Sequence, residues 1–341
     1  MAKILSATLD PKHLGTIIWA IVIVLLGLSI TPAPWYQFWA FEIAGAGYLW
    51  YGATSLLLLC SLAYFRPRPL RRHLRKLILT LAIALIFYGT TILNWYIPRI
   101  IDSMSGGIPV TAMTYNVNDR YWDAASVARV VRSQQADIFG LIEPFPDQAT
   151  ELHALIDDLY PHFYAATAGE LSLYSRYPIV QATTEKLQTP FSSLFATLDI
   201  QGKAVRVAIV HPLAPLSPKH FRGRNQNLSA LAEDARAHSS DYSSAAIVMG
   251  DFNTASWSIY FRNFLRRSGL RSASLGHGIH PTWFYVSSAR PHVLLYQFVQ
   301  LLKVPIDHIL VSPQIRIDRV TTAPAGISDH CPLIAKIRIP E

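Results

Sequence analysis

Cysteine is almost absent from this 341-residue chain, which contains only Cys60 and Cys331. Cys60 lies in a long apolar block and Cys331 in a polar motif near the C-terminus, so we expect no disulfide between them. No cysteine and histidine spacing typical of structural zinc is present either. The fold must therefore be stabilised by its own hydrophobic core, for which about 240 residues of globular chain are enough.

Charged residues are also scarce, at 15% of the chain against 51% hydrophobic residues. This proportion of charge is low for a wholly soluble protein. The apolar residues form long blocks near the N-terminus, whereas the rest of the chain has short apolar runs broken by Gly, Pro, Asp and His. The change predicts a membrane domain over residues 1–100 and a globular domain over residues 108–341.

Three apolar blocks near the N-terminus contain no charged side chain. They cover residues 14–30, 43–65 and 77–97, and each is close to the roughly 20 residues that a helix needs to cross about 30 Å of hydrocarbon. A cleaved signal peptide is the alternative for the first block, although Pro32 and Pro34 do not fit a cleavage site. Buried core helices are the alternative for the other two. We expect three transmembrane α-helices.

The short segment between the second and third blocks predicts the orientation. Its sequence RPRPLRRHLRK, residues 66–76, holds six basic residues and no acid, and loops of this kind stay in the cytoplasm. Nucleic-acid binding is the alternative interpretation. The N-terminus is then cytoplasmic, and an odd number of spans carries the globular domain to the outer face. The sequence thus predicts a multi-pass protein of the inner (cytoplasmic) membrane with a periplasmic or extracellular C-terminal domain.

The globular part alternates short β-rich runs with helical stretches, and it has no internal repeat and no low-complexity tract. VTAMTYNV at 110–117 indicates a strand, and WDAASVARVVRSQQA at 122–136 indicates a helix with Asp123 as its N-cap. SSLFATLDI at 192–200 and KAVRVAIVHP at 203–212 look like neighbouring antiparallel strands. Such mixed strands and helices predict layered α/β packing, with two sheets between helices.

A narrow set of polar residue types stands at the ends of these apolar strands. The residues are Asn116 and Asn118 in TYNVN, Glu143 in FGLIEP, His211 in VAIVHP, Asp251 and Asn253 in VMGDFN, Asp307 and His308 in PIDHILVS, and Asp329 and His330 in GISDHCPL. Any one of them alone is an ordinary loop residue. Their repetition at so many strand ends indicates that they converge on one site.

The order of these motifs resembles that of the endonuclease/exonuclease/phosphatase superfamily of metal-dependent phosphoesterases. The resemblance covers about residues 108–339, and the specific combination is GDFN followed by a downstream SDH. It implies a four-layer α/β sandwich, in which two central mixed β-sheets are flanked by helices and the active site lies at one edge of the paired sheets. The cofactor implied is Mg²⁺, with Mn²⁺ as a possible substitute.

The resemblance also implies which residues bind the metal. Glu143 is the principal metal carboxylate, and Asn118 and Asp329 are ligands directly or through water. Asn116 orients Glu143 or the phosphate. Some family members have Asp at the position of Asn118, so the amide here gives a less negative site. These oxygen ligands suit Mg²⁺, which neutralises the charge of a phosphoester while water attacks it.

The remaining residues are implied to carry the chemistry. Asp251 aligns and deprotonates the attacking water, and Asn253 donates its NH₂ group to a phosphoryl oxygen. His330, held by Asp307, contacts the phosphate and stabilises the charge that develops in the transition state. A carboxylate partner fixes the tautomer of the imidazole and favours its charged form. His308 is either part of this site or a structural residue.

Two features bear on the substrate. His211 resembles the sphingomyelinase and phosphatase branches of the superfamily, since the nuclease branch tends to carry an amide there. The whole layout resembles bacterial membrane proteins associated with teicoplanin resistance, which implies a hydrolase of a lipid-linked phosphoester or pyrophosphate at the outer face of the membrane. The apolar segment RPHVLLYQFVQLLKVP at 290–305 is then either a membrane-touching flap or a core element.

Two alternatives remain open. An extracytoplasmic nuclease is supported by basic residues of the domain, namely Lys219, Arg222, Arg224, Arg266, Arg267 and Arg271. The sequence shows no base-stacking motif with interleaved aromatic residues, which disfavours that alternative. A non-catalytic binding or sensor module is disfavoured by the complete set of polar residues. Membrane lipids are the expected partners, and no protein partner is inferred.

Overall fold

The computed structural model describes most of the chain. The described residues are 39–65, 71–99, 102, 106–166, 170–187, 189, 192–239, 245–284 and 303–341, with Ile17, Ala20, Ile21 and Val24 before them. Contacts divide the chain into two units, Met1–Asn94 and Trp95–Glu341.

The first unit is helical in its described part. The helices are α2 (Trp39–Ala46), α3 (Tyr48–Phe65) and α4 (Arg71–Leu93). Gly47 separates α2 from α3. Within this unit α3 packs against α4.

The predictions of three transmembrane helices and of a multi-pass membrane protein with an exported domain are wrong. Among the described residues, no helix combines the length and the apolar character that crossing a bilayer requires. The predicted span 43–65 is interrupted at Gly47, which leaves the 18 residues of α3, or about 27 Å of helix. The predicted span 77–97 falls largely in α4, which ends at Leu93 and whose first turns carry four of the six basic residues assigned to a loop. The predicted span 14–30 lies largely outside the described residues.

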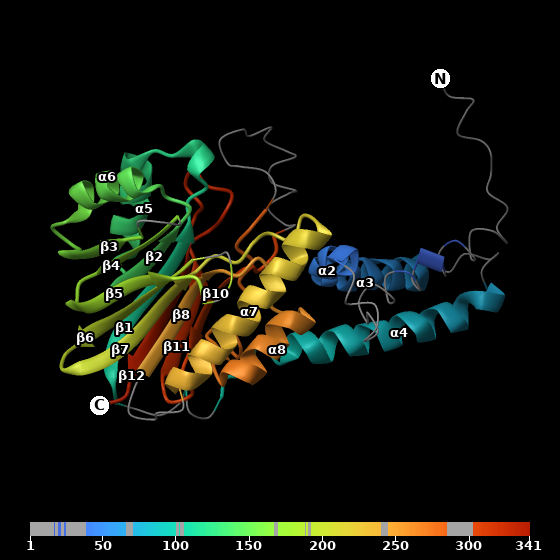
Figure 1. Ribbon diagram of the computed structural model, residues 1–341. Helices are drawn as coiled ribbons and strands as arrows, with labels where there is room; N and C mark the ends of the chain where they lie inside the picture. Colours follow the sequence, from blue (N-terminus) through green and yellow to red (C-terminus); the bar gives the residue numbers. More distant parts are fainter. Residues whose placement is uncertain are drawn as a thin grey trace, which may run out of the picture. The chain divides into compact units, whose positions relative to one another are not determined.

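The second unit contains two six-stranded sheets (Figure 1). The first has the order β11-β12-β1-β2-β4-β3, with bounds β1 Ile108–Asn116, β2 Ile138–Ile142, β3 His162–Ala165, β4 Leu171–Ser175, β11 Arg316–Thr322 and β12 Leu333–Ile339. The second has the order β5-β6-β7-β8-β10-β9, with bounds β5 Ile179–Glu185, β6 Ser193–Ile200, β7 Lys203–Val210, β8 Ala245–Asp251, β9 Arg271–Ser272 and β10 Asp307–Val311.

Both sheets are mixed. β1 runs parallel to β2 and β7 parallel to β8, while the other pairs are antiparallel. The predicted antiparallel pairing of 192–200 with 203–212 is confirmed as β6 with β7. The parallel pairs bring the carboxyl ends of their strands to the same edge of each sheet, which is where the polar motifs of the sequence stand.

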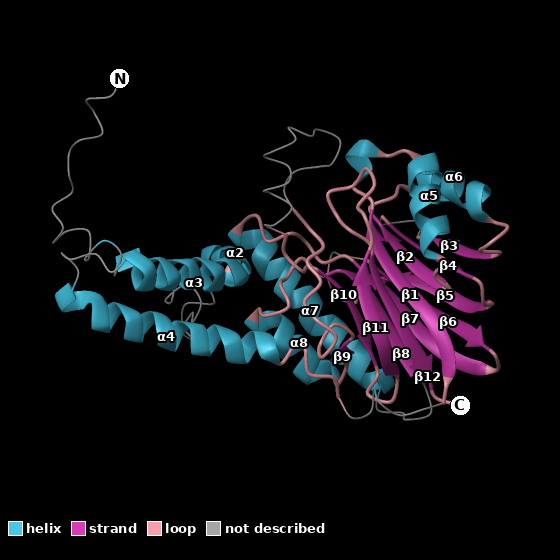
Figure 2. Cartoon of the chain, turned by 180° about the vertical axis from the view of Figure 1, so that it is seen from behind, coloured by secondary structure: helices cyan, strands magenta, loops and turns pink. Residues whose placement is uncertain are grey.

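Helices cover the outer faces of the sheets. They are α5 (Ala124–Gln134), α6 (Pro146–Ile156), α7 (Pro218–Ser239) and α8 (Ile259–Ser268). Figure 2 shows the same layers from behind. The buried residues of α5 and α6 pack on the first sheet, those of α7 and α8 pack on the second, and a third apolar cluster fills the space between the sheets. The predicted α/β sandwich of two mixed sheets flanked by helices is therefore confirmed.

The close approach of the two sheets depends on Gly140 in β2. A Cβ atom there would lie 2.5 Å from Cδ1 of Ile209 on β7, well inside contact distance. Both cysteines are free. The segment 290–305 lies almost entirely outside the described residues.

Candidate active site

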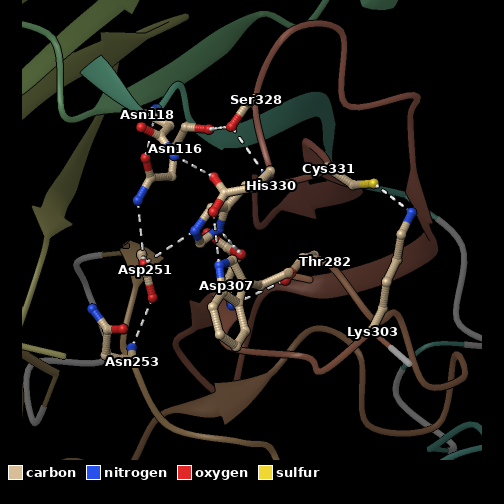
Figure 3. A network of polar contacts seen from close by, with 12 residues as sticks. Asn116, Asn118, Asp251, Asn253, Thr282, Lys303, Asp307, Ser328, His330 and Cys331 are labelled. Carbon is tan, nitrogen blue, oxygen red and sulfur yellow. Dashed lines mark hydrogen bonds and ion pairs between the residues drawn. The ribbon is translucent and has the colours of Figure 1, made fainter. Parts of the chain in front are cut away.

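Most of the predicted polar residues meet at one edge of the paired sheets, and Figure 3 shows six of them, namely Asn116, Asn118, Asp251, Asn253, Asp307 and His330. β1 and β8 end there in Asn116 and Asp251. β10 runs antiparallel to β8, so its first residue, Asp307, pairs in register with Asp251. The sheet topology thus gathers residues that are far apart in the sequence.

Asn116 connects the two sheets at this edge. Its Nδ2 donates to Oε1 of Glu143 at 2.9 Å and to Oδ2 of Asp251 at 3.2 Å. Its Oδ1 accepts a hydrogen bond from the backbone N–H of Asn118 at 3.0 Å. Asn116 is fully buried, so one amide group fixes two carboxylates and the start of the next loop.

Glu143 directly follows β2 and adopts a left-handed backbone conformation with φ of 69°. Its backbone N–H donates to the carbonyl of Glu170 at 2.8 Å. Nε2 of His211 lies 3.6 Å from Oε1 of Glu143 and 3.8 Å from Oδ2 of Asp251. The side chains of Glu143 and His211 are 24% and 23% exposed, whereas that of Asp251 is 3% exposed. A ligand therefore approaches from the side of Glu143 and His211.

Asp329 has a hydrogen bond to each carboxylate oxygen. Nδ2 of Asn118 donates to Oδ1 at 2.8 Å, and Nε1 of Trp283 donates to Oδ2 at 3.1 Å. Asn118 has a left-handed φ of 52° and begins the short helix η3 (Asp119–Tyr121). The bonds from Asn118 and Trp283 fix the orientation of the Asp329 carboxylate.

Asp251 and Asn253 lie in a tight turn after β8. Gly250 precedes them with φ of 154°, and a Cβ atom there would lie 1.9 Å from the carbonyl oxygen of Val210. The backbone N–H of Asn253 donates to Oδ1 of Asp251 at 2.8 Å, and its Nδ2 donates to the carbonyl of Pro212 at 2.9 Å. The glycine lets β8 lie against the end of β7, and the turn projects both side chains toward the same edge.

His330 and Asp307 form a buried pair. Nδ1 of His330 lies 2.8 Å from Oδ2 of Asp307, and Nε2 lies 3.7 Å from Oδ2 of Asp251. The backbone N–H of His330 donates to Oγ of Ser328 at 3.0 Å. Burial lowers the pKa of His330, but the Asp307 carboxylate outweighs it through its charge and its hydrogen bond and raises that pKa to about 10. The imidazole is therefore cationic at neutral pH.

Two other groups have shifted pKa values. Burial raises the pKa of Asp251 to about 8; the charge of Asp307 acts in the same direction and that of His330 opposes it. Burial lowers the pKa of His211 below its usual range, against the attraction of Glu143. The edge thus combines a neutral imidazole, a cationic imidazole and a carboxyl group that titrates near pH 8, which is typical of sites for proton transfer.

His308 points away from this group. Its Nε2 lies 2.9 Å from the carbonyl oxygen of Thr254, and its ring stacks on Phe261 with centroids 4.0 Å apart. Burial lowers its pKa to about 4. Of the two interpretations of His308, the structure supports a structural residue.

Two sets of side chains have the chemistry of a cation site. Glu143, Asp329 and Asn118 offer carboxylate and amide oxygens, which suit a hard divalent cation, and neighbouring N–H donors orient both carboxylates as outer-shell partners do at metal sites. Asp251, Asp307 and His330 also have ligand atoms within 4.8 Å of one another. In that set Nδ1 of His330 already bonds to Asp307. We therefore regard the first set as the better fit.

Several contributors were not found from the sequence. Trp283 and Ser328 hold Asp329, Asn116 and His330, and Glu170 adds a carboxyl group beside Glu143. Ser328 directly precedes Asp329, the acid of the SDH motif, so its place in that motif could have indicated that it belongs to the site. Trp283 lies in a different segment, and nothing in its neighbouring residues indicates its contact.

Two of the basic residues considered for nucleic-acid binding are inaccessible. Arg224 is fully buried and Arg271 is 4% exposed. Arg271 instead pairs with Asp102, and Arg267 pairs with Glu233. These contacts weaken the argument for a nucleic-acid surface.

Solved structures share the fold of the second unit. The endonuclease/exonuclease/phosphatase from Bacteroides vulgatus is 18% identical, with 68% of this chain and 99% of that chain covered and a TM-score of 0.53. Sphingomyelinase C from Streptomyces griseocarneus is 17% identical, with 67% and 99% covered and a TM-score of 0.50. Truncated TDP2 from Caenorhabditis elegans is 15% identical, with 68% and 98% covered and a TM-score of 0.53. No curated protein matches the chain.

Sequence identities this low show only that the fold is shared, whereas a match to a family model assigns the chain to a family. The model of the Endonuclease/Exonuclease/phosphatase family matches residues 113–330. This range is more than half of the chain and contains all the predicted site residues. The chain therefore belongs to the endonuclease/exonuclease/phosphatase family.

Proposed function

We propose that this protein is a divalent-metal-dependent phosphoesterase whose active site is the edge described above. Members of the family are generally phosphoester-hydrolysing enzymes and typically depend on a divalent metal. The observation that carries the proposal is the position of Asn116, whose amide bonds to both Glu143 and Asp251. One side chain thus connects the residues suited to hold a cation with those suited to activate water.

Glu143, Asp329 and Asn118 would hold the metal, for which we propose Mg²⁺ with Mn²⁺ as a substitute. When bound, it supplies positive charge against the phosphoryl oxygens. Asn116 holds Glu143 in position for this task. Nδ2 of Asn118 donates to Asp329 and Oδ1 accepts the backbone N–H of Arg120 at 3.4 Å, so Asn118 would act on the metal by orienting Asp329 or through a water molecule.

Asp251 is the proposed general base. Its pKa of about 8 is close to the working pH, as suits a general base, and the ionised form that accepts a proton increases as the pH rises toward 8. Oδ1 accepts the backbone N–H of Asn253 and Oδ2 accepts Nδ2 of Asn116, and the second lone pair of Oδ2 is proposed to take a proton from the attacking water. One hydrogen of the Asn253 NH₂ group bonds to Pro212, and the other is proposed to bond to a phosphoryl oxygen.

His330 is the proposed cation that stabilises the developing negative charge. Its Nδ1 is held by Asp307, so Nε2 is the atom directed at the phosphate. A fixed cation in a buried site needs little reorganisation during the reaction. His211, between Glu143 and Asp251 and partly exposed, is proposed to contact the phosphate from the open side.

For the substrate we propose a lipid-linked phosphoester or pyrophosphate. His211 at this position is the supporting residue, and sphingomyelinase C, as its name states, is a sphingomyelin hydrolase with the same fold. A nuclease remains the second candidate and is an outcome of the test.

The test is a substrate panel with the purified full chain. Bis(p-nitrophenyl) phosphate, farnesyl pyrophosphate, sphingomyelin in detergent micelles and supercoiled plasmid are each incubated with Mg²⁺ and with EDTA. We expect Mg²⁺-dependent release of product from the diester and from a lipid substrate, and its loss in Asp251→Asn. Plasmid nicking without lipid hydrolysis would replace the substrate proposal by the nuclease. Absence of turnover on every substrate would contradict the enzymatic proposal itself.

A further inference from the structure

Two buried side chains to which we assign no part in the reaction bind the turn that carries Asp251. We call residues 251–254 the catalytic turn. Nη1 of Arg224, on α7, donates to the carbonyl oxygen of Asn253 at 2.9 Å. Nε2 of His308, on β10, lies 2.9 Å from the carbonyl oxygen of Thr254. Two successive carbonyl groups of the turn are thus each held by a side chain from a different element.

Arg224 is an unusual residue to bury. It is fully buried, and its guanidinium carbon lies 5.2 and 5.3 Å from the ring centroids of Phe221 and Tyr260. Its Nε and Nη2 both donate to Oδ1 of Asn225. Removing a guanidinium from water is costly, so an apolar residue of similar size would fill the space between α7 and β8 at a lower cost. Such a residue would lack the hydrogen bond to the catalytic turn as well as the local bonds to Asn225.

The backbone conformation of the catalytic turn depends on contacts with side chains of other elements. Asn253 adopts a left-handed φ of 49°, a conformation that Asn tolerates better than other residues with a Cβ atom but that surrounding contacts must still maintain. Its backbone N–H bonds to Oδ1 of Asp251, so any rotation of the Asn253 peptide also moves the Asp251 carboxylate. The peptide between Asn253 and Thr254 carries the carbonyl that Arg224 holds. The contact of Arg224 is therefore coupled to the orientation of Asp251 through one residue.

We propose that Arg224 and His308 are positioning residues that clamp the catalytic turn and so fix the orientation of Asp251 and Asn253. Neither side chain touches the substrate, since both act through backbone carbonyl groups. The effect on catalysis rests on the proposed phosphoesterase function, whereas the effect on the turn does not.

The main test compares Arg224→Met with Arg206→Met in the full chain. Arg206 is a matched control because it also joins α7 to the sheet, through Asp234, and also lies over an aromatic ring, that of Phe195 at 4.9 Å. Hydrogen exchange is measured by mass spectrometry on the peptide that contains the catalytic turn. We expect faster exchange there in Arg224→Met than in Arg206→Met, with partial recovery in Arg224→Lys.

The second readout is the hydrolysis of bis(p-nitrophenyl) phosphate with Mg²⁺. Displacing a reacting group by about an ångström reduces rates by up to about a hundredfold, so we expect kcat of Arg224→Met to fall about tenfold to a hundredfold with KM little changed. Arg206→Met should lower the melting temperature and leave kcat and KM unchanged. Equal exchange in the turn for the two variants would overturn the clamp.

His308→Phe keeps the test decisive if Arg224→Met does not fold. Phenylalanine retains the packing against Phe252 and Phe261 but loses the hydrogen bond to Thr254. Faster exchange in the catalytic turn supports the clamp, and wild-type exchange with wild-type kcat contradicts it. If exchange rises but the wild-type protein hydrolyses no phosphoester, the clamp stands and the proposed function fails.

Discussion

At the scale of single residues, the site depends on how each charged group is partnered. Burial favours the neutral imidazole of His330, and Asp307 is the main group that opposes it, with the charges of Asp251 and Asp329 acting in the same direction. A raised pKa in the folded protein stabilises the fold below the unfolded pKa of about 6.5. That contribution is lost as the pH rises through about 10. The cation that we propose for catalysis is therefore present throughout the neutral range.

Asp307→Asn tests this dependence. The amide keeps the size of the side chain and removes its charge, so the pKa of His330 should fall and the cationic form should be lost at a lower pH. We expect kcat/KM for bis(p-nitrophenyl) phosphate to decline on the alkaline side well before it does in the wild type, with a loss of about tenfold or more near pH 8. Profiles between about pH 6 and pH 11 give the answer. Superimposable alkaline limbs for the two proteins would show that Asp307 does not set the charge of His330.

Trp283→Phe tests the support of Asp329. Phenylalanine keeps the ring but cannot donate to Oδ2 of Asp329, and loss of such an outer-shell bond typically weakens metal affinity about tenfold to a hundredfold. A higher Mg²⁺ concentration for half-maximal activity is the expected result. Trp122→Phe is the control, since Trp122 donates from the same atom to Glu151 at 2.9 Å on the surface. Equal Mg²⁺ requirements in both variants would rule out this role.

The residues that the sequence reveals are those that directly follow or begin strands. Glu143, Asp251 and Asp307 stand next to apolar runs, and their residue types fit a known motif order. Trp283 and Arg224 contact the site only through the tertiary fold. The residues next to them in the sequence form no motif that indicates a functional site. Residue types at strand ends are thus readable from the sequence, whereas the partners that orient them are not.

At the scale of elements, the close packing of strand ends requires glycine at one position. β7 and β8 run parallel, and Gly250 stands one residue before Asp251 with its Cα facing the backbone of Val210. Any side chain there would meet a carbonyl oxygen that is itself part of the sheet, which cannot move without opening the β7 and β8 pair.

Gly250→Ala is therefore expected to destabilise the fold by about 3 kcal/mol or more. The folded fraction should also have a lower kcat, because relief of the overlap displaces Asp251. Gly202→Ala is the control: Gly202 also has a positive φ, 82°, but a Cβ atom there meets nothing within 4 Å. Chemical denaturation of both variants distinguishes the free-energy cost of the steric overlap at residue 250 from the cost of placing alanine at a positive φ. Similar losses of unfolding free energy would show that β7 and β8 adjust without cost.

Element boundaries account for the main failure of the sequence prediction. A window of apolar residues does not reveal that a helix breaks at Gly47, nor that α4 begins at Arg71 within a run of basic residues. The alternation of strands and helices after residue 108 was readable, because each element there has a short and distinct pattern. The membrane orientation inferred from the basic segment 66–76 depended on the three predicted spans, so it is incorrect as well.

At the scale of the whole molecule, the second unit begins before its first strand. Asp102 and Arg271 form a bidentate pair at 2.6 and 3.0 Å, and their side chains are 2% and 4% exposed. Asp102 also accepts the backbone N–H of Ile317 at 3.0 Å. The residue thus joins the start of the unit to β9 and β11. Burial opposes ionisation, but Arg271 outweighs it and lowers the pKa of Asp102.

Asp102→Ala is expected to reduce the unfolding free energy by about 3–5 kcal/mol, because it leaves the Arg271 guanidinium buried without its carboxylate. Since the folded pKa of Asp102 is depressed, its contribution should be present above its unfolded pKa and be lost as the pH falls through the folded one. Asp158→Ala is the control, because Asp158 pairs with Arg132 on the surface, where both side chains are about half exposed, and should cost about 1 kcal/mol or less. Equal costs for the two variants would contradict this account.

We propose that Glu143 and Asp251 serve one reaction at one site, and a double-mutant cycle measures their coupling. Glu143→Gln, Asp251→Asn and the double variant are assayed for Mg²⁺-dependent hydrolysis of bis(p-nitrophenyl) phosphate. Residues that act as a unit are strongly non-additive, so the double variant should be about as slow as the slower single variant. Losses that multiply, or single variants that turn over at the wild-type rate, would contradict the claim.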